Sequence, residues 1–180
     1  YPAKFIPEIP HNLIKILPIP DGTAILDPFC GSGVTLVEAS SIGYNSVGID
    51  LNPIACLISR VKTRYLDSEI LGMGQEFVEK AKKLKTVKTP EIPNLDHWFK
   101  KEVQVGLAKL MIEINQTQEI RYKEALQAAV SSIIVRVSNQ DSDTRYAAVK
   151  NDVSENDVYD YFLKSLNFIY KHSSQKGLFD

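Results

Sequence analysis

A glycine-rich turn and one acidic residue beyond it are the parts of this sequence best suited to bind a ligand. Gly31, Ser32 and Gly33 form the turn, and Asp50 follows Gly31 after 19 positions. Glycines let a backbone approach a ligand closely, and a helix that begins there favours negative charge at its first N–H groups. An acidic side chain at the end of the next strand can accept hydrogen bonds from ribose hydroxyls. This spacing, close to the roughly 20 positions of nucleotide-binding units, indicates a site for an adenosine-containing ligand.

Two other nucleotide-binding motifs do not match this turn. The dinucleotide fingerprint requires a third glycine where Leu36 stands, and the phosphate-binding loop requires Gly-Lys followed by Ser or Thr, which the sequence lacks. Neither NAD nor ATP is therefore favoured. The structural alternative is a plain turn between strand and helix, in which Asp50 only caps the helix that follows it.

The elements around the turn alternate between strand and helix. Residues 23–26 and 46–49 are short apolar runs with β-branched residues and are expected to be buried strands. Helical spacing follows over 35–42 and again over 53–62, where Asn52 is suited to be the N-cap. A strand, helix, strand, helix order predicts an α/β fold with parallel strands and helices packed on them.

The rest of the chain has a different pattern and is predicted to be mostly helical. A proline-bearing link at 89–93 interrupts it, and the polar segment 138–145 is expected to be a loop between helices. We therefore divide the chain into a first region, 1–63, and a helical region, 64–180. Apolar residues recur every three or four positions over 66–84, 103–114, 126–137 and 158–169.

Composition limits the classes of protein to consider. With 180 residues, 44% hydrophobic and 24% charged, the chain is expected to fold around a core. A formal net charge of −1 gives no global attraction to nucleic acid, so DNA binding would need a local basic patch. Two separate cysteines and three scattered histidines predict no disulfide framework and no metal site, and favour a cytoplasmic location. No uninterrupted apolar run is long enough to predict a membrane span.

Three motifs in sequential order resemble one enzyme family. Residues 27–39 resemble the S-adenosylmethionine-binding motif of the amino-methyltransferases that modify adenine N6 or cytosine N4 in DNA. Residues 47–53 resemble the second motif of that family, and residues 1–5 resemble its remaining cofactor motif, which folds back beside the glycine loop. One departure is Val34, where the family usually has Thr. The resemblance implies a partial Rossmann-like methyltransferase core that binds S-adenosyl-L-methionine and is followed by the helical region.

The resemblance assigns roles around the methionine part of the cofactor. Asp27 would lie near the methionine amino group, and Phe29 would form an apolar wall. Gly31, Ser32 and Gly33 would line the methionine portion.

The resemblance also assigns residues to the adenosine part. Asp50 would hold the ribose hydroxyls, and Leu51 and Asn52 would flank the adenosine. Lys4 and Phe5 would close the pocket from the N-terminal arm. Only the glycines and Asp50 also have a reason independent of the resemblance.

The family's catalytic motif, Asp, Asn or Ser followed by Pro-Pro and Tyr or Phe, does not occur here. The nine prolines are never adjacent, so no catalytic residue is assigned. Because the chain starts with Tyr1, we expect the cofactor part of a longer DNA methyltransferase, with 64–180 in the position of a DNA target-recognition segment. Such a piece would expose an apolar sheet face and depend on its missing half or on self-association. An RNA guanine-N2 methyltransferase and a non-catalytic cofactor- or DNA-binding subunit are the alternatives.

Overall fold

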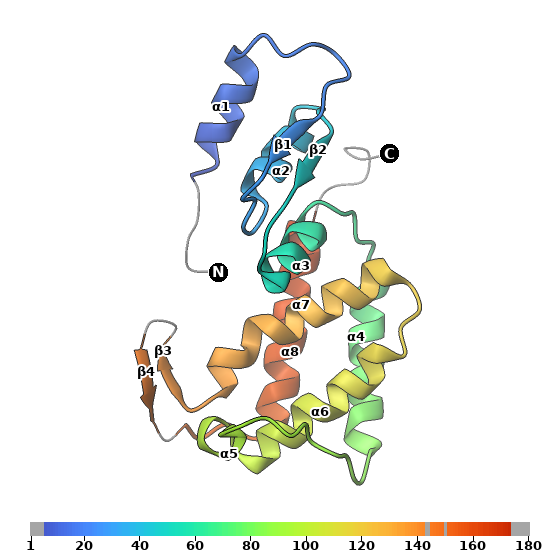
Figure 1. Ribbon diagram of the computed structural model, residues 1–180. Coiled ribbons are helices and arrows are strands. Elements are labelled where there is room, and N and C mark those ends of the chain that lie inside the picture. The colour runs from blue at the N-terminus through green and yellow to red at the C-terminus, as the bar shows by residue number, and fades with distance from the viewer. Residues whose placement is uncertain (1–5, 143–144, 150, 174–180) are drawn as a thin grey trace. The chain divides into compact units, whose positions relative to one another are not determined.

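The computed structural model describes residues 6–142, 145–149 and 151–173 (Figure 1). The described residues form two compact units. The first unit runs to Leu66 and also includes His172, and the second runs from Asp67 to Lys171. No helix among these residues is both long and apolar enough to cross a membrane.

The first unit is a small parallel sheet with three helices. Strands β1 and β2 pair in parallel, with Ile25 opposite Ser46 and Asp27 opposite Gly48. This confirms the predicted mixed α/β character and parallel pairing of the N-terminal region. In chain order the elements are α1 (Glu8–Ile16), β1 (Ile25–Asp27), α2 (Val34–Ser41), β2 (Ser46–Gly48) and α3 (Pro53–Lys62).

Local chemistry sets the helix boundaries of this unit. The Asn52 side chain accepts a hydrogen bond from the Ile54 N–H at 2.9 Å, and Pro53 occupies the first helical position of α3. Helix α1 packs on α2, where His11 Nδ1 lies 2.9 Å from Glu38 Oε2 and the Ile14 side chain is buried. The predicted strand, helix, strand, helix order therefore begins with an additional helix that lies against α2.

The two faces of the sheet differ. Side chains alternate along a strand, and α2 contacts both strands. Leu26 and Val47 are neighbours in the ladder and are 61% and 52% exposed, and Ile49, two positions after Val47, is also exposed. One sheet face is thus a stretch of apolar side chains that nothing in the described part of the first unit covers.

The second unit is a helical assembly with a short hairpin (Figure 1). Fully buried side chains from several helices, among them Leu110, Leu126 and Phe162, form its core. The helices expected from the apolar spacing are present. In chain order the elements are α4 (Glu69–Lys83), α5 (Leu95–Trp98), α6 (Lys101–Asn115), α7 (Ile120–Val137), β3 (Gln140–Ser142), β4 (Arg145–Ala148) and α8 (Glu155–His172).

One detail of this unit differs from the sequence analysis. The expected polar loop at 138–145 is wrong, because β3 and β4 pair there as an antiparallel hairpin with Gln140 opposite Ala148. Backbone bonds from Asn139 N–H to the Trp98 carbonyl and from Val149 N–H to the Asn139 carbonyl hold its base. Gly74 lies inside α4 where a Cβ would overlap the Leu166 side chain, so it permits close packing on α8.

A partly buried ion pair joins α6 to the start of α8. Lys109 Nζ donates to Glu155 Oε1 at 2.8 Å, and the Tyr159 hydroxyl donates to the same oxygen. Burial alone raises the pKa of Glu155, but the hydrogen bonds from Lys109 and Tyr159 outweigh it and hold that pKa below its usual range. Folding is therefore favoured by the ionised form of Glu155.

We expect the Glu155→Gln variant to lose roughly 2 kcal/mol of stability at pH 7, because Lys109 would lose its charged partner. A carboxyl with a lowered folded pKa stabilises above its unfolded pKa of about 4.3 and loses this effect as pH falls. The difference between wild type and variant should therefore shrink below about pH 4. Urea unfolding followed by fluorescence of Trp98, the single tryptophan, measures it. Glu79→Gln, at an exposed pair with Lys82, is the control and should change stability little; equal effects of both substitutions would contradict the prediction.

Candidate functional site

The glycine turn and the acidic residue after β2 are in direct contact. Asp50 Oδ2 accepts a hydrogen bond from the Gly31 N–H at 2.9 Å, and Oδ1 accepts one from the Asn52 N–H at 2.8 Å. Backbone pairing continues past the strands, because the Cys30 N–H donates to the Ile49 carbonyl at 2.9 Å. The carboxyl ends of β1 and β2 therefore bring Gly31, Asp50 and Asn52 together.

Two residues of α3 also hold the turn, and the sequence analysis did not identify them. Ser59 Oγ donates to the Gly31 carbonyl at 2.8 Å, and Lys62 Nζ donates to Ser32 Oγ at 3.2 Å. The Ser32 side chain is buried. Ser59 and Lys62 lie three positions apart on one face of a helix, but nothing in their spacing indicates a partner 28 to 30 residues earlier.

Positive backbone angles explain the glycines of the turn. Gly31 has a φ of 49° and Gly33 a φ of 78°, in the left-handed region that other residues rarely adopt. Gly33 is the N-cap of α2, and a Cβ on it would lie 2.9 Å from the Cβ and Oγ of Ser59. The turn thus needs glycine at 33 both for its backbone angle and for the approach of α3.

The remaining predicted residues of the site lie around this turn. Asp27 Oδ1 accepts a hydrogen bond from the Phe29 N–H at 3.1 Å, which fixes the start of the loop. The Phe29 side chain is 88% exposed and that of Leu51 is fully exposed. They form no closed wall with the described residues. Lys4 and Phe5 lie outside the described residues.

Cys30 is part of the turn and is buried. Burial raises the pKa of its thiol, the contact with Ser59 lowers it by less, and the carboxylates of Asp27 and Asp50 raise it further. A neutral thiol is a poor nucleophile, so Cys30 serves as a packing residue of the loop. Within the part of the chain that the structure describes, no group of three His, Cys, Asp or Glu residues is arranged to hold a metal ion.

Comparisons with known proteins agree on one class of enzyme. Residues 1–60 match the profile of the family described as DNA methylase. The type II methyltransferase M.MvaI of Kocuria varians is 29% identical over 91% of this chain and 40% of its own length. The type II methyltransferase M.MjaII of Methanocaldococcus jannaschii is 44% identical over 39% of this chain and 13% of its own length.

A further similarity is shorter. The tRNA (guanine(10)-N2)-dimethyltransferase of Methanocaldococcus jannaschii is 33% identical over 29% of this chain and 15% of its own length. The chain spans less than half the length of each of these relatives. No solved structure matches it significantly.

The parallel strands, the glycine turn and the acidic residue after β2 are arranged in the order that the sequence analysis associates with nucleotide binding. The matches above support a family of DNA amino-methyltransferases for this chain. The family resemblance seen in the sequence is thereby confirmed.

We expect Gly33→Ala to destabilise the first unit by clearly more than Gly22→Ala. Both glycines have nearly the same φ, 78° and 77°, so both substitutions cost about 1 kcal/mol of backbone strain. Only at Gly33 does the new methyl group collide with Ser59, whose hydroxyl holds the Gly31 carbonyl, whereas Gly22 has open space around it. Hydrogen exchange of the Cys30 and Ile49 amides should report the difference. Equal losses in the two variants would show that the contact with Ser59 does not restrict the turn.

Proposed function

We propose that the complete protein transfers a methyl group from S-adenosyl-L-methionine to an exocyclic amine of DNA, adenine N6 or cytosine N4. The observation that carries this proposal is the match to a type II methyltransferase over 91% of the chain, which includes both units. The match to a tRNA methyltransferase extends over 29% only and supports the RNA guanine-N2 alternative less.

The geometry around Asp50 supports a role in holding the adenosine part of the cofactor. A carboxylate offers about four acceptor positions, and the backbone N–H groups of Gly31 and Asn52 use one on each oxygen. Each oxygen therefore retains an acceptor position for a ribose hydroxyl. The side chains of Phe29, just before the glycine turn, and of Leu51, next to Asp50, are exposed and offer apolar surface.

The cofactor, when bound, supplies an activated methyl group on a positively charged sulfur. In our proposal the chain's own residues bind and orient it. Asp27 lies beside the turn for the methionine amino group, and Gly31, Ser32 and Gly33 bring the backbone close to the methionine part. Asn52 stays at the N-terminus of α3, where its side chain is held by the Ile54 N–H.

For the helical region we propose a role in recognising the DNA target. The densest run of lysines, 80–88, is not the surface that we propose for DNA. Lys80 pairs with Glu76, Lys82 with Glu79 and Lys88 with Glu91, so neighbouring glutamates offset three charges of the run.

The Pro-Pro motif accepts the hydrogens of the amine in this family. We propose that a part of the protein beyond these 180 residues supplies it.

Cofactor binding is the first test of this proposal. We expect the 180-residue chain to bind S-adenosyl-L-methionine in a calorimetric titration, and Asp50→Asn to weaken binding by about tenfold or more, which is 1.4 kcal/mol. Leu51→Ala removes a fully exposed side chain, so a weaker affinity there would arise from a lost ligand contact and not from unfolding. Asp21→Asn, in the exposed turn before β1, is the matched control. If wild type gives no heat, or if all three variants bind alike, the proposed cofactor site is wrong.

The transfer itself is tested with labelled cofactor. Duplex DNA and transfer RNA are offered in competition to the longest natural form of the protein and to this chain alone. We expect label on adenine or cytosine amines of DNA with the long form and none with this chain. Label on guanine N2 of RNA would establish the alternative, and cofactor binding with no transfer by the long form would favour a non-catalytic subunit.

We also propose that a further layer of protein covers the exposed sheet face of Leu26, Val47 and Ile49. When the 180-residue chain is studied alone, a second copy of the chain forms that layer. Burying such apolar surface yields about 25 cal/mol per Å². Sedimentation of the chain should show concentration-dependent association, and Leu26→Lys combined with Val47→Glu should abolish it. Glu8→Lys, on the exposed start of α1, serves as the control. A wild-type chain that stays monomeric at all concentrations would contradict self-association.

A further inference from the structure

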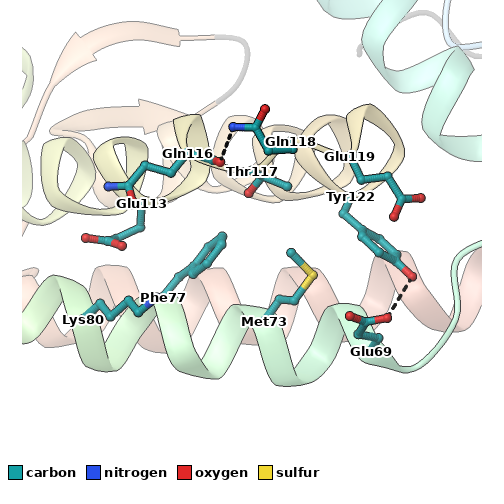
Figure 2. A pocket seen from close by; sticks show the side chains of 10 residues that line it. All are labelled: Glu69, Met73, Phe77, Lys80, Glu113, Gln116, Thr117, Gln118, Glu119 and Tyr122. Carbon is teal, nitrogen blue, oxygen red and sulfur yellow. Dashed lines mark hydrogen bonds between the residues drawn. The ribbon is translucent and has the colours of Figure 1, made fainter.

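A cleft of about 380 Å³ lies within the second unit, between α4 and the segment that joins α6 to α7 (Figure 2). Its floor is apolar, with Met73 and Phe77 on α4. The opposite wall carries polar and acidic side chains from the end of α6 and the start of α7. These are Glu113, Gln116, Thr117, Gln118, Glu119 and Tyr122.

Two oxygen-bearing side chains in this cleft have no hydrogen-bond partner among the described residues. The Thr117 hydroxyl is inaccessible to solvent and makes no hydrogen bond there, and the residue is only 9% exposed. Glu113 is 7% exposed, and no hydrogen bond or ion pair joins its carboxylate to another described residue. Figure 2 shows both side chains directed from the upper wall toward α4. Burying the Thr117 hydroxyl without a partner costs free energy, which indicates that a donor belongs beside it.

The charges that line the cleft favour a cation. Glu69, Glu113 and Glu119 contribute three carboxylates, against the single ammonium of Lys80. Lys80 pairs with Glu76 at 2.7 Å, outside this set. It is also attracted by the charge of Glu113, and its Nζ lies 5.9 Å from the centroid of the Phe77 ring, so a cation bound in the cleft would share these two groups with Lys80.

The three carboxylates of the cleft differ in burial and in donors. Glu119 is exposed and accepts a hydrogen bond from Arg121 at 2.7 Å. Glu69 is exposed and lies 3.4 Å from the Tyr122 hydroxyl, whose shorter hydrogen bond, at 2.6 Å, goes to Asp67. Glu113 is the buried carboxylate of the three, and an anionic ligand such as a phosphate would be repelled.

We propose that this cleft binds a guanidinium group, as presented by arginine. A guanidinium is flat, carries five N–H donors in a fixed fork and matches a carboxylate with two parallel hydrogen bonds. Glu113 would accept that pair and Thr117 Oγ1 would accept a further N–H. The Phe77 ring offers a surface on which the plane stacks. An ammonium group cannot stack in this way, so it fits the apolar floor less well. The proposal does not depend on the cofactor site.

Free arginine derivatives and arginine side chains of a polypeptide share this chemistry, so the experiment includes both. The 180-residue chain is titrated with N-acetyl-arginine amide, with Gly-Arg-Gly, and with N-acetyl-citrulline amide, in which a neutral urea of the same shape replaces the guanidinium. We expect saturable shifts of the cleft signals by NMR with a dissociation constant on the order of 1 mM for both arginine probes. Citrulline amide should bind at least about tenfold more weakly. Binding of the tripeptide alone would assign the cleft to polypeptide arginines.

Variants separate the cleft from general charge effects. Glu113→Gln keeps the shape but removes the charge and should weaken arginine binding by about tenfold or more, and Thr117→Val should weaken it by a smaller factor. Glu79→Gln removes an exposed carboxylate of α4 outside the cleft and should leave binding unchanged. Melting curves establish that each variant is folded. The citrulline comparison uses wild type only and so stands even if a variant fails to fold. Absence of saturable binding, or equal binding of citrulline and arginine amides, would overturn the proposal and leave water as the partner of Glu113 and Thr117.

Discussion

The carboxylate of Asp50 determines the local structure of the first unit more than any other group. It accepts one hydrogen bond from the glycine turn, at Gly31, and one from Asn52 at the entrance of α3. Two segments that are 19 positions apart are thus joined at the carboxyl ends of two parallel strands. Hydrogen bonds to a carboxylate are stronger than neutral ones, so Asp50 holds the turn in shape, and in our proposal the same side chain also receives the ribose.

This double use of one carboxylate has a consequence for binding. A side chain that must be fixed on binding loses conformational freedom, and fixing one typically costs about 0.5 to 1.5 kcal/mol. Asp50 is already fixed by two backbone N–H groups, and Ser59 and Lys62 fix the opposite side of the turn through Gly31 and Ser32. In our proposal the ligand therefore meets a prearranged acceptor. The same arrangement makes stability and binding hard to separate at Asp50, which is why the exposed Leu51 is informative.

Patterns with a short period were predictable from the sequence, and contacts between distant residues mostly were not. Helical spacing identified α4, α6, α7 and α8, and the strand, helix, strand order required a parallel ladder. The contact of Asp50 with Gly31 was foreseeable because both follow neighbouring parallel strands. Ser59 and Lys62 could not be found, since a hydroxyl or an amine on an amphipathic helix is compatible with solvent. The hairpin at Gln140–Ala148 was missed because apolar and polar residues do not alternate in the sequence of its two strands.

A comparison of Glu113 with Glu155, a partly buried glutamate of the same unit, supports a ligand in the cleft. Glu155 receives hydrogen bonds from Lys109 and Tyr159, and together they lower its pKa despite burial. Glu113 is more buried than Glu155 in the same helical unit, but no described residue donates to it. Moving a carboxylate away from water without a donor is unfavourable, and a leucine at the same place on α6 would avoid that cost. In our proposal a cationic partner supplies the donors to Glu113 when it binds.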